Sequence, residues 1–148
     1  MKKIMVLFLV YSVVALSGSL FAETRKKAEI SLAGGSFISE GGSSAFGAAS
    51  LGYYFKWIGA ELNGAVLEGG GIIGCNLVIG IFDSPRLIPY TTGGIWTTTY
   101  GGGGFDVGGG IKMKLSEAFA IRAEYRRYVT SDTDWGVSAA IGGISLFF

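Results

Sequence analysis

Two neighbouring stretches of this sequence alternate between apolar and polar residues, and this pattern limits the fold more than any other feature. In Phe105–Leu115, "FDVGGGIKMKL", one parity holds apolar residues and glycine, while the other holds an aspartate and two lysines. In Phe119–Val129, "FAIRAEYRRYV", the charged parity holds two arginines and a glutamate. A period of two places alternate side chains on opposite faces of a β-strand. We therefore expect two adjacent strands, each with one apolar and one charged face.

The same pattern extends along the chain and predicts eight strands, although the second and eighth are rich in glycine and alternate less clearly. The expected strands are 27–37, 44–55, 57–67, 71–82, 87–98, 104–115, 118–129 and 135–148. Tight links at Lys56, Asp83–Arg86 and Ser116–Glu117 would lie at one end of the sheet. Segments rich in Gly, Ser and Asp, at 39–43, 68–70, 99–104 and 130–134, would lie at the other end. Eight strands joined in this way predict an all-β fold, an antiparallel up-and-down barrel with both termini at the same end.

The first 22 residues have the layout of a secretory signal peptide. Lys2 and Lys3 precede the apolar run Ile4–Leu16, and small residues lead to an expected cleavage site after Ala22. A retained anchor is the alternative, but this run of 13 residues is shorter than the roughly 18–20 that a spanning helix needs. We expect residues 1–22 to be the signal peptide and residues 23–148 to be the barrel domain.

The rest of the chain is strongly apolar but offers no run of 18 apolar residues free of charge or glycine. Hydrophobic residues make up 49% of the sequence. An exported chain of this kind, without a spanning helix, favours the other architecture that crosses a membrane, a closed β-barrel.

Composition excludes several functional classes. The charges nearly cancel, with 12 Lys and Arg against 11 Asp and Glu, so nucleic acid is not an expected partner. There is no histidine, which rules out a Ser–His–Asp or Cys–His catalytic arrangement. Cys75 is the single cysteine, and "GGGIIG" at Gly69–Gly74 is followed by a strand instead of the helix that a dinucleotide site requires. We predict no catalytic residue, no cofactor and no metal site.

Charged residues on the inward parity are the candidate functional group. With the apolar parity facing outward, the inward polar set is Glu29, Glu61, Asn63, Asn76, Lys112, Lys114, Arg122, Glu124 and Arg126. Charges enclosed in a narrow barrel must be paired, or each costs several kcal/mol. We expect a structural network of ion pairs that plugs the lumen. A narrow gated pore is the alternative, and a catalytic pair of Glu29 and Glu61 is disfavoured because basic side chains share the same lumen.

Aromatic residues near the strand ends suggest two belts at the membrane interfaces. One would contain Tyr53, Phe55, Trp57, Tyr90, Phe147 and Phe148, and the other Trp96, Tyr100, Tyr125, Tyr128 and Trp135. Arg127 falls on the outward parity near the second belt, where it would contact lipid phosphates or simply face solvent.

The second half of the chain resembles a known family. "RLIPYTTGGIW" at Arg86–Trp96, the two alternating stretches and the aromatic C-terminus are similar to the small outer-membrane β-barrel proteins of Gram-negative bacteria, the superfamily of the OmpA and OmpX barrels. The resemblance implies an outer-membrane location with periplasmic termini, contact with lipids including lipopolysaccharide, and a monomer. It also implies handling by periplasmic chaperones and the barrel assembly machinery, and says nearly nothing about activity.

The ending "IGGISLFF" is similar to the C-terminal signal by which such barrels are recognised for assembly. Gly143, Leu146 and Phe148 match that signal, whereas Ile141 stands where a polar residue is usual. Because alternation does not distinguish inside from outside, three functions stay open at this point. They are a structural or surface-interacting membrane barrel, a small channel, and a soluble lipocalin-like periplasmic binder of apolar ligands.

Overall fold

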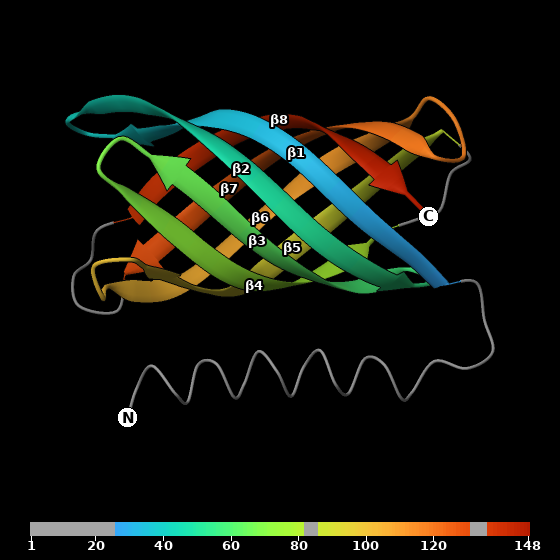
Figure 1. Cartoon of the computed structure of the whole chain (residues 1–148), viewed down its shortest axis with the longest axis horizontal. Coiled ribbons are helices and arrows are strands. Elements are labelled where there is room, and N and C mark those ends of the chain that lie inside the picture. The colour runs from blue at the N-terminus through green and yellow to red at the C-terminus, as the bar shows by residue number, and fades with distance from the viewer. Residues whose placement is uncertain (1–25, 82–85, 131–135) are drawn as a thin grey trace.

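The chain folds into one closed, eight-stranded antiparallel barrel (Figure 1). The computed structural model describes residues 26–81, 86–130 and 136–148. Each strand pairs with its neighbours in chain order, and β1 pairs with β8 to close the barrel. The strands are β1 (Lys26–Ser39), β2 (Gly42–Phe55), β3 (Ile58–Leu67), β4 (Gly70–Gly80), β5 (Leu87–Thr98), β6 (Gly103–Lys114), β7 (Phe119–Thr130) and β8 (Gly136–Phe147).

The predicted fold class and the eight predicted strands are confirmed, with strand ends displaced by at most two residues. The proposed signal peptide at residues 1–22, most of the 83–86 and 130–134 connections, and Trp135 lie outside the described residues. Within the described part of the chain, no helix is long and apolar enough to cross a membrane.

The strands are staggered, and the stagger sets the width of the barrel. A walk along paired residues once around the barrel returns to β1 ten residues further on, through Ala28, Tyr53, Ala60, Leu77, Gly93, Val107, Arg127, Ser138 and Ile38. Eight strands with this stagger tilt by about 40° from the barrel axis and leave a backbone cylinder roughly 8 Å in radius. Side chains can fill an interior of this width.

The two faces of the strands differ sharply in chemistry. Leu32, Val66 and Ile73 point outward and are 55–72% exposed, whereas Glu29 and Glu61 point inward and are buried. A strand of twelve residues tilted in this way rises about 30 Å, enough to cross a hydrocarbon core. The apolar wall is thus on the outside, which is opposite to what a lipocalin-like binder of apolar ligands requires.

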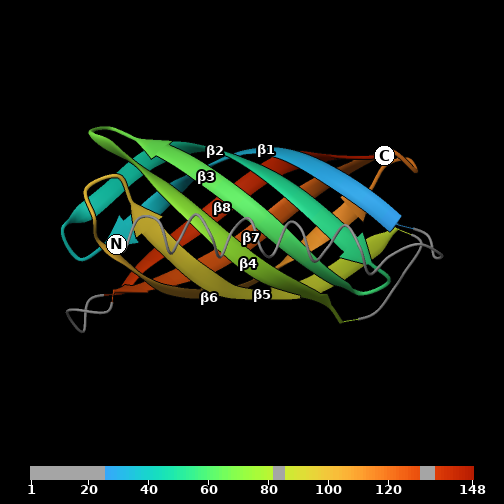
Figure 2. The ribbon, with the colours of Figure 1, turned by 60° about the horizontal axis from the view of Figure 1, so that its bottom comes forward.

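Short turns connect the strands at both ends of the barrel (Figure 2). The end that holds Lys26 and Phe148, here called the terminal end, has the two-residue turn Lys56–Trp57. The opposite end, called the distal end, has the two-residue turns Glu40–Gly41 and Glu68–Gly69. Gly69 adopts a φ of 92°, which glycine tolerates because it has no Cβ.

Candidate functional site

Seven charged side chains meet inside the barrel, and all are at most 5% exposed. We call this group the lumen network; it consists of Glu29, Glu61, Asp106, Lys112, Arg122, Glu124 and Arg126. The alternation of β1, β3, β6 and β7 points these residues inward, and the stagger of the strands brings them within bonding distance of their partners.

Arg122 is the centre of the network. Its Nη1 donates to Glu61 Oε2 at 2.8 Å and its Nη2 donates to Glu61 Oε1 at 3.0 Å. The same guanidinium donates from Nη2 to Glu124 Oε2 at 2.5 Å and from Nε to the Tyr90 hydroxyl at 2.8 Å. Two-point pairing with a carboxylate is the strongest arrangement that arginine offers. Arg122 therefore links β3, β5 and β7 across the lumen.

Arg126 extends the network toward the distal end. Its Nε donates to Glu124 Oε1 at 2.6 Å, and its Nη1 lies 3.7 Å from Asp106 Oδ1. Asn76 donates from Nδ2 to the same Asp106 oxygen at 2.5 Å and accepts from Asn63 Nδ2 at 2.5 Å. Among the described residues, Asp106 Oδ2 has no hydrogen-bond partner.

Lys112 completes the network toward the terminal end. Its Nζ donates to Glu29 Oε2 at 2.5 Å and to the Tyr54 hydroxyl at 3.0 Å. Tyr54 in turn donates to Glu61 Oε2 at 3.1 Å, which joins this pair to Arg122. Ser31 donates to Glu29 Oε1 at 2.9 Å, so the carboxylate has a second partner.

Glycines opposite the large polar residues give the network its space. Gly52 pairs with Glu61 across the β2–β3 ladder, and Gly110 pairs with Glu124 across the β6–β7 ladder. Gly59 lies against the ring of Tyr54, so that a Cβ there would overlap the ring. These glycines therefore make room for bulky inward side chains.

An apolar cluster fills the lumen nearer the distal end. Phe37 and Phe46 stack with ring centroids 4.4 Å apart, and Tyr128 packs edge-on against Phe37 at 5.5 Å. Trp96 packs edge-on against Tyr128 at 5.8 Å. The interior thus has a charged section toward the terminal end and an aromatic section toward the distal end.

Four aromatic residues expected in the outer belts face inward instead, so that part of the belt prediction is wrong. Tyr90 and Tyr128 are buried, and Trp96 packs on the same interior cluster. Phe147 lies on the inner face of β8, with its ring centroid 5.9 Å from Lys112 Nζ. The hydroxyl of Tyr90 donates to Glu124 Oε2 at 2.6 Å, which shows why a tyrosine suits this lumen as well as it suits an interface. Outward aromatics do lie toward both ends, including Trp57 and Tyr125.

The residues predicted to point inward do point inward, and one of them lies at the end of its strand. Lys114 is the last residue of β6 and is half-buried, whereas the other six predicted charges are buried. Asp106 was missing from the predicted set, although it shares the parity of Lys112. Tyr54 and Tyr90 were also missed, because an aromatic near a strand end gives no sign of which face it takes.

The remaining predicted positions lie outside the network. Arg127 is exposed on the outer wall. Leu146 and Phe148 point outward and Gly143 is half-buried on the inner face of β8. The Phe148 amide donates to the Ala28 carbonyl at 3.0 Å and its carbonyl accepts from the Ala28 amide at 3.0 Å, so the last residue continues the seam with β1.

The charged groups of this site are largely paired with one another. Within the described residues, no group of three or more His, Cys, Asp or Glu side chains is placed to hold a metal ion. The carboxylates in the network bond to cations, amides or hydroxyls, and the Glu29 carboxylate that accepts from Ser31 also accepts from Lys112. The arrangement can fix the spacing of strands across the lumen and exclude solvent from it.

Comparisons with known proteins agree with this architecture. No family profile matches the sequence, and no curated protein matches it. A de novo designed transmembrane β-barrel superposes with a TM-score of 0.69 at 12% identity, covering 86% of this chain and all of the design. The N-terminal barrel domain of Pseudomonas aeruginosa OprF gives 0.68 at 18% identity, covering 82% of this chain and 97% of the domain.

A third solved structure superposes over a similar share of this chain. Neisserial surface protein A gives a TM-score of 0.65 at 14% identity, covering 83% of this chain and 97% of that protein. Identities this low show a shared fold. The chain has the fold of the small eight-stranded outer-membrane β-barrels.

Proposed function

We propose that this protein is a non-enzymatic integral outer-membrane barrel whose lumen network acts as a structural plug. The observation that carries the proposal is the network itself, in which charges from four strands are buried and paired inside a wall that is apolar on its outer side. Removing so many charges from water is tolerable when each is paired. A pore would instead need water along the axis, where aromatic rings now pack.

We further propose an orientation with both termini in the periplasm. The predicted signal peptide at residues 1–22 would deliver the chain to the periplasm, where chaperones and the barrel assembly machinery would receive it. Gly143, Leu146 and Phe148 would form the assembly signal. The distal end would then face outward among lipopolysaccharide molecules, with Arg127 near their phosphates, and the barrel would act as a monomer.

The distal turns limit what this surface could bind. One solved neighbour is Ail of Yersinia pestis, whose structure holds the heparin analogue sucrose octasulfate; it superposes with a TM-score of 0.60 at 15% identity. In this chain, the described distal turns carry exposed Glu40 and Glu68. Carboxylates repel sulfates, so a polyanion is not the partner that we propose for these turns.

Two measurements test the proposal. Gel electrophoresis of membrane fractions, with and without boiling, should show a faster band for the unboiled protein in the outer membrane. Planar bilayers that contain the refolded protein should show no steady single-channel currents. Recovery in the soluble periplasmic fraction would refute the membrane assignment. Regular conductance steps would refute the structural plug and favour the alternative of a narrow pore.

A further inference from the structure

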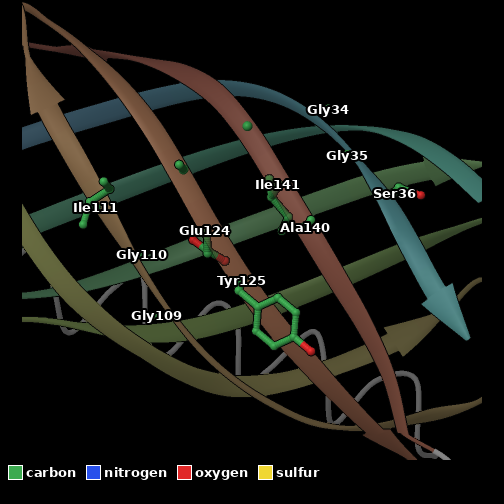
Figure 3. Close-up of a pocket in the computed structure, with 12 residues that line it drawn as sticks. Gly34, Gly35, Ser36, Gly109, Gly110, Ile111, Glu124, Tyr125, Ala140 and Ile141 are labelled. Carbon is green, nitrogen blue, oxygen red and sulfur yellow. The ribbon is translucent and has the colours of Figure 1, made fainter.

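A shallow depression on the outer wall crosses β1, β8, β7 and β6 (Figure 3). Its volume is about 860 Å³. The strand pairing places small residues side by side on its floor, because Gly34 pairs with Gly142 and Gly142 pairs with Ala123. The next outward row toward the distal end continues the floor with Ser36 and Ala140, which also pair.

Larger residues frame this floor on two sides. Toward the terminal end, Leu32 pairs with Ile144 and Ile144 pairs with Ile121. On the β7 side, the ring of Tyr125 stands on the outer wall. The depression is therefore a recess bordered by bulky side chains on these two sides.

A polar group lies directly distal to the recess. Arg127 pairs with Ser138 across the β7–β8 ladder, and the guanidinium extends over Gly136, whose Cβ position would lie 2.7 Å from Nη2. The Tyr125 hydroxyl donates to Ser138 Oγ at 2.7 Å. Among the described residues, no carboxylate pairs with Arg127. A cation with two hydroxyls above an apolar recess matches an anionic headgroup that carries acyl chains.

We propose that this recess and Arg127 form a binding site for lipid A, with a phosphate at Arg127 and an acyl chain on the floor of Gly34, Ala123, Ala140 and Gly142. The choice of lipid A rests on the proposed orientation, because the distal end must face the outer leaflet. A second copy of the chain fits less well. Two barrels related by a twofold axis along the membrane normal would place both Arg127 side chains at the same height and facing each other.

The site can be tested with the refolded protein in phosphatidylcholine nanodiscs that contain a small fraction of lipid A. The measurement is the amount of lipid A retained per barrel after detergent extraction, by mass spectrometry. Arg127→Gln removes the charge, and Gly142→Leu fills the recess. A Cβ at Gly142 would meet nothing within 4 Å, so this variant should fold; Ala123→Leu is a second filling variant.

Each variant has a matched control. Arg86→Gln removes an exposed cation at the terminal end, and Gly93→Leu adds the same bulk to the outer face of β5. We expect Arg127→Gln and Gly142→Leu to weaken retention about tenfold, the effect of losing one charge-assisted contact or a comparable apolar contact. The controls should stay within about twofold of wild type, a free-energy change of less than about 0.5 kcal/mol.

Chemical variants of the lipid separate the two parts of the site. With dephosphorylated lipid A, Arg127→Gln should match wild type while Gly142→Leu still binds less. Phosphatidylglycerol is then tested in place of lipid A. If the wild-type protein retains less phosphatidylglycerol than lipid A, the result supports lipid A as the ligand. Equal retention of the two lipids would overturn the assignment to lipid A. If neither test variant differs from its control, the site is refuted even when insertion and the absence of conductance still support the structural barrel.

Discussion

Replacing Arg122 with methionine tests whether the lumen network stabilises the barrel. Methionine keeps much of the length of the side chain but leaves Glu61 and Glu124 without the guanidinium that bonds to both. Removing one partner of a buried ion pair costs about 3–5 kcal/mol, because the remaining charge stays buried and uncompensated. We expect a loss of this size in the free energy of unfolding, measured by urea titration of the refolded protein in lipid vesicles.

A matched control lies five residues away on the same strand. Arg127→Met removes the same side chain from the outer wall, where the arginine is exposed, and should change the unfolding free energy by no more than about 1 kcal/mol. A triple variant that adds Glu61→Gln and Glu124→Gln to Arg122→Met should be more stable than Arg122→Met alone, since no charge is then stranded. Equal losses for Arg122→Met and Arg127→Met would refute the structural role of the network.

Further predictions concern other parts of the barrel. Gly59→Ala should destabilise the protein by roughly 1–3 kcal/mol, because the new methyl group overlaps the Tyr54 ring, whereas Gly142→Ala should be nearly neutral in the same urea titration. Asp106→Asn should cost less than about 1 kcal/mol, because the Oδ2 atom that it replaces has no partner among the described residues; a loss as large as that of Arg122→Met would contradict this. Deleting Phe148 should lower the yield of assembled barrel in cells far more than it lowers the urea stability of barrels that do form, and equal effects would argue against an assembly signal.

The period of two predicted the strands and the inward charges well, because each strand of a membrane barrel must separate two environments. Lys112 and Arg122 could be assigned to the lumen from their own strands alone. Their partners could not be assigned, since the pairing of Arg122 with Glu61 depends on the stagger accumulated over four strand junctions. Tyr90 was assigned to the wrong face for another reason. A ring with a hydroxyl suits both a membrane interface and a polar lumen, and its glycine-rich neighbours do not indicate which of the two it occupies.

The distribution of charge between the two halves of the chain has a consequence for assembly. Among the buried charges of the described residues, β1 and β3 contribute Glu29 and Glu61, while every cation comes from β6 or β7. An N-terminal fragment that ends before β6 would carry these carboxylates into lipid without a counter-charge, at a cost of several kcal/mol each. Such incomplete chains would therefore stay in water, because burying their unpaired carboxylates in lipid costs free energy. Only a chain that includes β6 and β7 brings Lys112, Arg122 and Arg126 to these carboxylates and can enter the bilayer with them paired.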